Sequence, residues 1–199
     1  ALLEFNNRKS IDYTLAALRA DPRITRICIV GPDVVFRAAQ ASNTALRIEH
    51  EPQGESFIES LEHGLSHFKG SSAVLIATED TPLITGASVA AFLDACAATP
   101  LRYKQNLLIS FAPKRAFVGP YAAARKTFNR VRGMSVMHGN LALVEPNLVE
   151  NVEFAAKMNM LYAGRKNWYT QLKAVGFRLT LAYVLGAFLV PLLSLEDRP

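Results

Sequence analysis

The residue with the clearest chemical potential is Asp80, which lies in the segment Thr78-Glu79-Asp80-Thr81-Pro82. An uninterrupted apolar run, Ala73–Ala77, precedes this segment and is typical of a β-strand that is buried on both faces. A carboxylate held at the end of such a strand, two residues before a proline, is suited to a divalent cation that is bound to phosphate groups. Asp is also common as an ordinary turn or cap residue, and that interpretation stays open.

A second group that could bind a ligand is His138-Gly139-Asn140. Gly139 would let the backbone approach a ligand closely, and the Asn140 amide can both donate and accept hydrogen bonds. The alternative is a plain hairpin turn, for which Gly-Asn is equally typical.

Positive charge is concentrated in one part of a chain whose formal net charge is +5. The window Ala95–Val144 contains no Asp or Glu, and it holds Arg102, Lys104, Lys114, Arg115, Arg125, Lys126, Arg130 and Arg132. Such a window is either a solvated face or a surface for phosphate groups. Few aromatic residues are interleaved with these cations, which argues against a nucleic-acid surface.

Short apolar runs alternate with amphipathic segments, and this alternation predicts the elements that must position these residues. Strands are predicted at Ile24–Val30, Ala45–Glu49, Ala73–Ala77 and Leu107–Phe111, and helices at Val34–Ala41, Ser56–Phe68 and Ala87–Ala98, with a first helix capped by Ser10. Ser135–Val144 is predicted to form two strands joined by a turn at His138-Gly139-Asn140, and the chain is predicted to be helical from about residue 147.

Strands that alternate with helices at this spacing predict an α/β protein, a three-layer α/β/α domain with a mostly parallel sheet. No linker or repeat divides the sequence, so a single domain over residues 1–199 is expected. Ligands of open α/β sheets bind beyond the carboxyl ends of the strands, which draws attention to the loops after Val30, Ala77 and Phe111.

The compartment is predicted from cysteine use and from the ends of the sequence. Cys28 and Cys96 have no metal-ligand or disulfide spacing, and Ala1 is not followed by a signal-peptide pattern, which favours the cytoplasm. The almost uncharged run Leu179–Leu195 leaves three interpretations open. It is a membrane span, a helix lying on a membrane surface, or a helix that is buried or forms a homodimer.

Taken in order, these segments resemble the nucleotidyltransferases with a GT-A-like fold, in the branch of the molybdenum-cofactor guanylyltransferases and the sugar-phosphate and cytidylyl transferases. Ala1–Leu15 resembles the segment that follows the family's Gly-rich phosphate loop, and Gly54 with Ser56–Leu65 resembles the segment that contacts the base. Ala77–Thr85 resembles the strand and turn whose aspartate binds Mg2+. Lys126–Arg132 and Gly139-Asn140 resemble a basic segment and a Gly-Gly-Asn turn on the acceptor side.

The resemblance implies transfer of a nucleotidyl group from an NTP to a phosphorylated small-molecule acceptor, with release of pyrophosphate. It implies that Asp80 is the catalytic residue that holds Mg2+ and that the substrate-binding residues are Gly54, Ser56, Lys126, Arg130, Gly139 and Asn140. The sequence departs from the family in three ways. The Gly-rich loop would lie before Ala1, a second metal-binding aspartate would lie beyond Pro199, and His138 stands where the family more often has Gly.

Two other functions remain open at this stage. A GT-A glycosyltransferase would use a nucleotide sugar, and Glu79-Asp80 offers adjacent acids, although without the usual Asp-x-Asp spacing. A nucleotide-binding relative without catalysis would share the fold but not the reaction.

Overall fold

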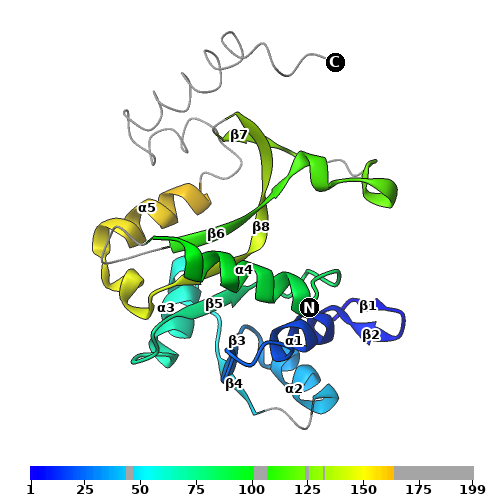
Figure 1. Ribbon diagram of the computed structural model, residues 1–199. Helices are drawn as coiled ribbons and strands as arrows, with labels where there is room; N and C mark the ends of the chain where they lie inside the picture. Colours follow the sequence, from blue (N-terminus) through cyan, green and yellow to red (C-terminus); the bar gives the residue numbers. More distant parts are fainter. Residues whose placement is uncertain (44–46, 101–106, 124–125, 132, 164–199) are drawn as a thin grey trace. The chain divides into compact units, whose positions relative to one another are not determined.

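The computed structural model describes residues 1–163 except 44–46, 101–106, 124–125 and 132 (Figure 1). The chain divides into two compact units. The first comprises Ala1–Ile109 and Asn140–Ala155, and the second comprises Ser110–Gly139 and the residues from Ala156 onward. A single domain over residues 1–199 stays a prediction, as does helical structure beyond residue 163.

The first unit contains the alternating helices and strands that the sequence predicts. Its helices are α1 (Ser10–Arg19), α2 (Asp33–Ser42), α3 (Phe57–His67), α4 (Gly86–Ala98) and the start of α5 (Val152–Ala163), which follows a 3-10 helix at Pro146–Glu150. Its strands are β1 (Glu4–Phe5), β2 (Arg8–Lys9), β3 (Ile27–Val30), β4 (Ile48–Glu51), β5 (Val74–Ala77) and parts of β6 (Leu107–Pro113) and β8 (Met134–Val144). The predicted α/β class is confirmed.

The side chains of β5 show why helices cover both faces of the sheet. Leu75 and Ala77 pack into a cluster with α1 and α4 around Leu18 and Val89. Val74 and Ile76 pack into another cluster with α3 and the 3-10 helix, around Leu65 and Leu148. Successive side chains of a strand point to opposite faces, so the two clusters lie on opposite sides of β5 and make three layers.

The sheet is less parallel than the sequence predicts. β3 pairs with β4 in parallel, with Ile27 opposite Ile48. By contrast, β8 runs antiparallel to β5, with Ala77 opposite Leu141, and β6 lies along the other edge of β8. The expectation of a mostly parallel sheet therefore holds for β3 and β4 but not for β8. The local sequence does not reveal the direction of β8, because a parallel and an antiparallel strand would bury the same alternating residues.

The prediction of two strands joined by a turn in residues 135–144 is wrong. β8 is one continuous strand through His138-Gly139-Asn140, and its hairpin with β7 (Asn129–Val131) turns earlier, at Gly133, where φ is +82°. Gly139 serves close packing instead of a turn. A Cβ at that position would lie 2.2 Å from the Ser110 Oγ atom and 3.1 Å from its carbonyl oxygen.

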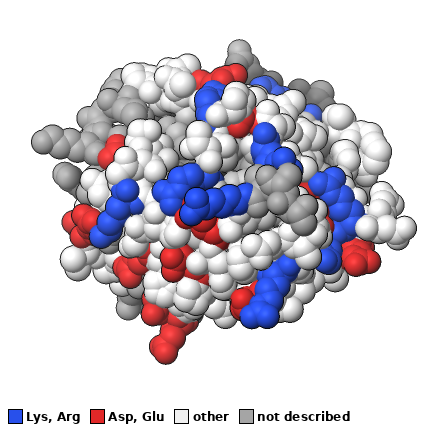
Figure 2. Space-filling model, turned by 90° about the horizontal axis from the view of Figure 1, so that it is seen from below, with Lys and Arg blue, Asp and Glu red and all other residues white. Residues whose placement is uncertain are grey.

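Charged side chains of both signs are mixed on the face shown in Figure 2. Several charged side chains of the first unit form pairs, such as Arg26 with Glu49 at 2.8 Å and Arg23 with Asp21 at 2.6 Å. Neither sign dominates the part of this face that is drawn in colour. That nucleic acid is not a partner stays a prediction.

Membrane contact is not addressed by the described residues. Among them, no helix is both long and apolar enough to cross a bilayer. The run Leu179–Leu195 lies outside the described residues, and its predicted roles on a membrane surface or in a homodimer stay predictions.

The α3 helix is held by Leu65, whose side chain is only 1% exposed in the cluster with Val144 and Leu148. We expect Leu65→Ala to lower the free energy of unfolding by about 2–5 kcal/mol, since it leaves a cavity. Val34→Ala on α2, where the residue is 60% exposed, should change it by less than about 0.5 kcal/mol. Urea denaturation measures both values, and equal losses would contradict this packing.

The ring of His67 on α3 bridges two acids of β4, with its Nδ1 atom 2.8 Å from the Glu51 Oε1 atom and its Nε2 atom beside Glu49. The hydrogen bond with Glu49 is the main cause that raises the pKa of His67, and the hydrogen bond with Glu51 is the second. Hydrogen bonds from Arg26 and His67 lower the pKa of Glu49 to about 2. Because the pKa of His67 is higher in the folded protein than in the unfolded chain, protonated His67 stabilises the fold. This stabilisation is complete below the pKa of the unfolded chain, about 6.5, and is lost as the pH rises through the pKa of the folded protein.

Thermal unfolding followed from pH 6 to pH 9 should therefore show a midpoint that falls as His67 loses its proton. His67→Gln should flatten this fall, whereas Ser66→Ala, an exposed and non-titrating neighbour on the same helix, should keep it. If the midpoint fell equally steeply with pH in the wild type and both variants, the ion pairs of His67 with β4 would not contribute to stability.

Candidate functional site

The loop that carries Asp80 begins where β5 ends and is held by hydrogen bonds within the loop and to β8. The Thr81 hydroxyl donates to the Thr78 carbonyl oxygen at 2.8 Å, and the Ile84 N–H donates to the Thr81 carbonyl oxygen at 3.0 Å. The Thr78 N–H donates to the Asn140 carbonyl oxygen of β8 at 3.3 Å. The register of β5 with β8 thus places Asn140 directly beside the start of this loop.

Two hydroxyl groups of α1 fix the same loop from the other side. The Ser10 Oγ atom donates to the Glu79 carbonyl oxygen at 2.7 Å, and the Thr14 Oγ1 atom donates to the Thr78 carbonyl oxygen at 3.4 Å. Both residues are buried, at 2% and 4% exposure, and they lie one helical turn apart on the same face. The prediction that Ser10 caps the helix is wrong, because α1 begins at Ser10 itself and the cap position is Lys9.

A cavity of about 220 Å3 lies at the carboxyl ends of β3 and β5. It is lined by Gly31 and Pro32 after β3, by Gln53 after β4, by Glu79 after β5, and by Ala1. Two of the three loops that the sequence singles out therefore converge on one cavity, as is general for ligand sites of α/β sheets. The third, after Phe111, belongs to the second unit.

Two acidic residues follow β5 in this loop: Glu79 lines the cavity, and Asp80 is the next residue of the chain. Asp80 and Glu79 are exposed, and the Glu79 Oε1 atom lies 4.0 Å from the amino group of Ala1. Within the described ranges, no group of three or more His, Cys, Asp or Glu side chains could hold a metal. Mg2+ typically takes one or two carboxylates and completes its shell with water and phosphate oxygens, so the donors present here fit Mg2+.

Gly54 and Ser56 lie in the loop after β4, where both take part in starting α3. The Ser56 hydroxyl accepts a hydrogen bond from the Glu59 N–H at 3.1 Å, and the Gly54 N–H donates to the Ser60 hydroxyl at 3.0 Å. Their predicted contact with substrate stays a prediction. The side chain that this loop adds to the cavity is that of Gln53, which the sequence did not single out.

The remaining predicted residues are in the second unit. Lys126 is exposed and precedes β7, and Arg130 lies within β7 opposite Ser135. Gly139 is the last residue of this unit in β8, next to Asn140 of the first unit. Asp80 and Asn140 thus both belong to the first unit, at the carboxyl end of β5. Lys126, Arg130 and Gly139 belong to the second unit.

The Asp80 loop follows the carboxyl end of β5, and ligands of open α/β sheets bind beyond the carboxyl ends of the strands. The family model of the MobA-like NTP transferase domain matches residues 1–152, and the chain belongs to this family. No curated protein matches the chain in sequence.

Solved structures agree with this assignment. A hypothetical transferase from Thermus thermophilus shares 25% identity at a TM-score of 0.70, over 94% of this chain and 73% of the other. 4-Diphosphocytidyl-2C-methyl-D-erythritol synthase from Anaerococcus prevotii shares 12% identity at a TM-score of 0.56, over 94% of this chain and 88% of the other. CMP:2-keto-3-deoxy-manno-octonic acid synthetase, solved with CTP, shares 11% identity at a TM-score of 0.51, over 93% of this chain and 79% of the other.

The last two structures support the fold alone, because their sequence identity to this chain is low. Together with the family match, they confirm the fold predicted from the sequence resemblance. The chain is therefore an enzyme of the nucleotidyltransferase class.

The anchoring of the site loop by α1 can be tested at Ser10. Ser10→Ala removes the hydroxyl that holds the Glu79 carbonyl, and we expect it to lower the free energy of unfolding by about 1 kcal/mol. Ser66→Ala, at an exposed serine of α3, is the matched control and should have almost no effect. Urea denaturation of both variants measures the difference, and an unchanged free energy for Ser10→Ala would show that α1 does not hold the loop.

Proposed function

We propose that this enzyme is a Mg2+-dependent nucleotidyltransferase that moves an NMP group from an NTP to a phosphorylated small-molecule acceptor. The observation that carries the proposal is the Asp80 loop, which is fixed by Ser10 and Thr14. Asp80 in this loop is exposed and directly follows Glu79, which lines the cavity at the strand ends. A fixed backbone with an exposed acid is what a phosphate-bound cation requires. The match to the MobA-like NTP transferase domain supports an NTP as donor.

In this reaction an oxygen of the acceptor phosphate attacks the α-phosphorus of the NTP. The bond from the α-phosphorus to the oxygen that bridges to the β-phosphate breaks, and pyrophosphate leaves with the electron pair of that bond. Asp80 would hold Mg2+, which when bound neutralises phosphate charge and aligns the reacting groups. The other contributions of the protein are positioning and electrostatic stabilisation.

The described residues divide these tasks between them. The Gln53 amide lines the cavity and can donate and accept hydrogen bonds, which suits the edge of a base or a ribose hydroxyl. Asn140, beside the Asp80 loop, offers a similar amide on the acceptor side. Lys126 and Arg130 are proposed to counter the phosphate charge of the acceptor, with Lys126 foremost because its side chain is exposed. We place the reaction in the cytoplasm, where nucleoside triphosphates and Mg2+ are abundant.

Thermal unfolding of the full-length protein with ATP, GTP, CTP or UTP, each with and without Mg2+, tests this proposal. A ligand that binds only the folded state raises the midpoint, by about 5 to 10 °C at a hundredfold excess over its Kd. We expect such a rise with one nucleotide when Mg2+ is present. Asp80→Asn should abolish the Mg2+-dependent part, because it removes the charge of the proposed ligand.

The matched control is Glu150→Gln, which removes an exposed acid of the first unit in the 3-10 helix before α5. It should leave the nucleotide-dependent rise unchanged. A midpoint that no nucleotide moves, or a Mg2+-dependent rise that survives Asp80→Asn, would contradict the proposed role of Asp80.

A further inference from the structure

Two histidine rings hold the backbone of the loops that border the candidate site. The cavity of about 220 Å3 is lined by Gly31 after β3 and by Gln53 after β4. The Nε2 atom of His50, in β4, lies 2.8 Å from the Gly31 carbonyl oxygen. The Nδ1 atom of His63, in α3, lies 2.8 Å from the carbonyl oxygen of Pro52, the residue before Gln53. A carbonyl oxygen only accepts, so each ring donates an N–H at the named atom.

The loop after β3 is fixed at both polar groups of the Gly31 backbone. Its N–H donates to the Glu51 carbonyl oxygen at 3.0 Å, and its carbonyl oxygen accepts from the His50 ring. The ring is held in turn, because Phe36 of α2 stacks on it with the ring centroids 4.7 Å apart and the planes 5° apart. Gly31 is buried, so its carbonyl would be costly to leave without the imidazole donor. His50 therefore fixes the backbone of this part of the cavity wall.

The loop after β4 is fixed by side chains of α3. The His63 ring donates to the Pro52 carbonyl oxygen, and the Ser60 hydroxyl accepts from the Gly54 N–H at 3.0 Å. Ser60 and His63 are three residues apart and hence neighbours on the surface of α3. Gln53, the residue that lines the cavity, lies between the two held residues. The position of the Gln53 backbone therefore depends on α3, and His63 supplies the anchor on its N-terminal side.

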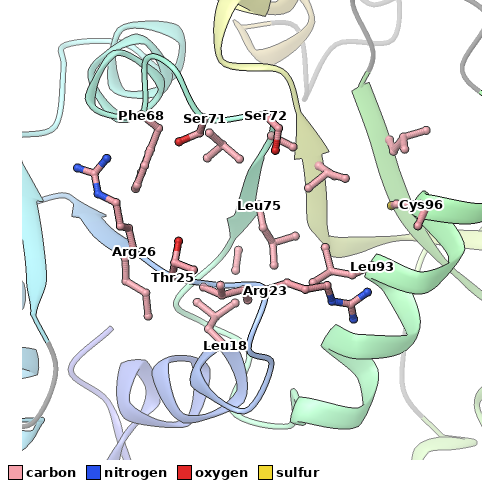
Figure 3. Close-up of a pocket in the computed structure, with 18 of the residues that line it drawn as sticks. Leu18, Arg23, Thr25, Arg26, Phe68, Ser71, Ser72, Leu75, Leu93 and Cys96 are labelled. Carbon is pink, nitrogen blue, oxygen red and sulfur yellow. The ribbon is translucent and has the colours of Figure 1, made fainter.

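A larger cavity of the first unit is lined by other residues. It has a volume of about 490 Å3 and is lined by Thr25 before β3 and Ser72 before β5, at the opposite ends of these strands (Figure 3). The described loop residues 31–32 and 52–56 do not line it. His67, which is also in α3, contacts two carboxylates of β4 instead of a loop carbonyl. The contacts of His50 and His63 are therefore tied to the smaller cavity, and His67 offers a control.

We propose that His50 and His63 are positioning residues for nucleotide binding, whose N–H groups set the two loops that receive the nucleoside part of the NTP. This inference rests on the proposed function. The Asp80 loop, which is proposed to hold Mg2+, is fixed separately by Ser10 and Thr14. Loss of either imidazole donor should therefore weaken nucleotide binding without releasing the Asp80 loop.

Hydrogen exchange of the full-length protein without nucleotide, followed by NMR, tests the positioning itself. His50→Phe keeps a ring against Phe36 but removes the donor, and it should speed exchange of the Gly31 amide by at least about threefold. His63→Phe should speed exchange of the Gly54 amide in the same way, since each amide belongs to the loop that the ring holds. Each variant should leave the other loop unchanged. An amide whose exchange is unchanged in its own variant would overturn the proposal.

Calorimetric titration with ATP, GTP, CTP and UTP in the presence of Mg2+ tests the consequence for binding. For the nucleotide that the wild type binds, His50→Phe and His63→Phe should raise the Kd by about tenfold, which is typical of one lost hydrogen bond. His50→Gln and His63→Asn place an amide N–H near the lost Nε2 and Nδ1 atoms, respectively, and should stay within about threefold of the wild type. His67→Gln removes contacts with β4 but no loop anchor, and it should keep the wild-type Kd.

Two kinds of failure are distinguishable in these measurements. The proposal would be overturned by a Kd that is unchanged in both Phe variants, that rises equally in His67→Gln, or that is the same for the Phe variants and their amide counterparts. If the wild type bound none of the four nucleotides, the proposed function would be contradicted, and with it the role of the two rings in binding. The exchange measurement uses no nucleotide, so it separates that result from a failure of the rings to hold their loops.

Discussion

The contact on which the site depends is the pair of hydroxyl hydrogen bonds from α1 to the loop after β5. Ser10 donates to the carbonyl oxygen of Glu79, and Thr14 donates to the carbonyl oxygen of Thr78, which also accepts from the Thr81 hydroxyl. Because α1 packs against β3 and β5, its hydroxyl groups are fixed, and the core of the first unit thereby sets the position of the loop. Asp80 can then stay exposed while its backbone is held.

A second constraint comes from β8, which runs against β5 and delivers Asn140 to the start of the same loop. An antiparallel neighbour brings its residues to a strand end from the opposite direction, so residues about 60 positions apart in the chain meet there. The fold thereby combines groups from α1, β5 and β8 at one edge of the sheet. The Gln53 loop after β4 reaches the same cavity.

Much of this fold follows from local patterns in the sequence. The apolar run before Thr78 predicts β5 because it is short and a turn segment follows it, and the helical periodicity of residues 57–67 predicts α3. The loop of Asp80 is found from the end of that strand. The direction of β8, the use of Gly139 for close packing and the hydroxyl contacts of α1 depend on partners far away in the chain, and no short segment encodes them.

The position of the site can be measured most directly by hydrogen exchange of the full-length protein, with and without the nucleoside triphosphate it binds, in the presence of Mg2+. The account predicts slower exchange of amides in two segments, Thr78–Thr81 after β5 and Gln53–Gly54 after β4, which belong to loops that border one cavity. Unchanged exchange at Thr78–Thr81, with protection confined to other segments, would contradict the placement of the nucleotide at the Asp80 loop.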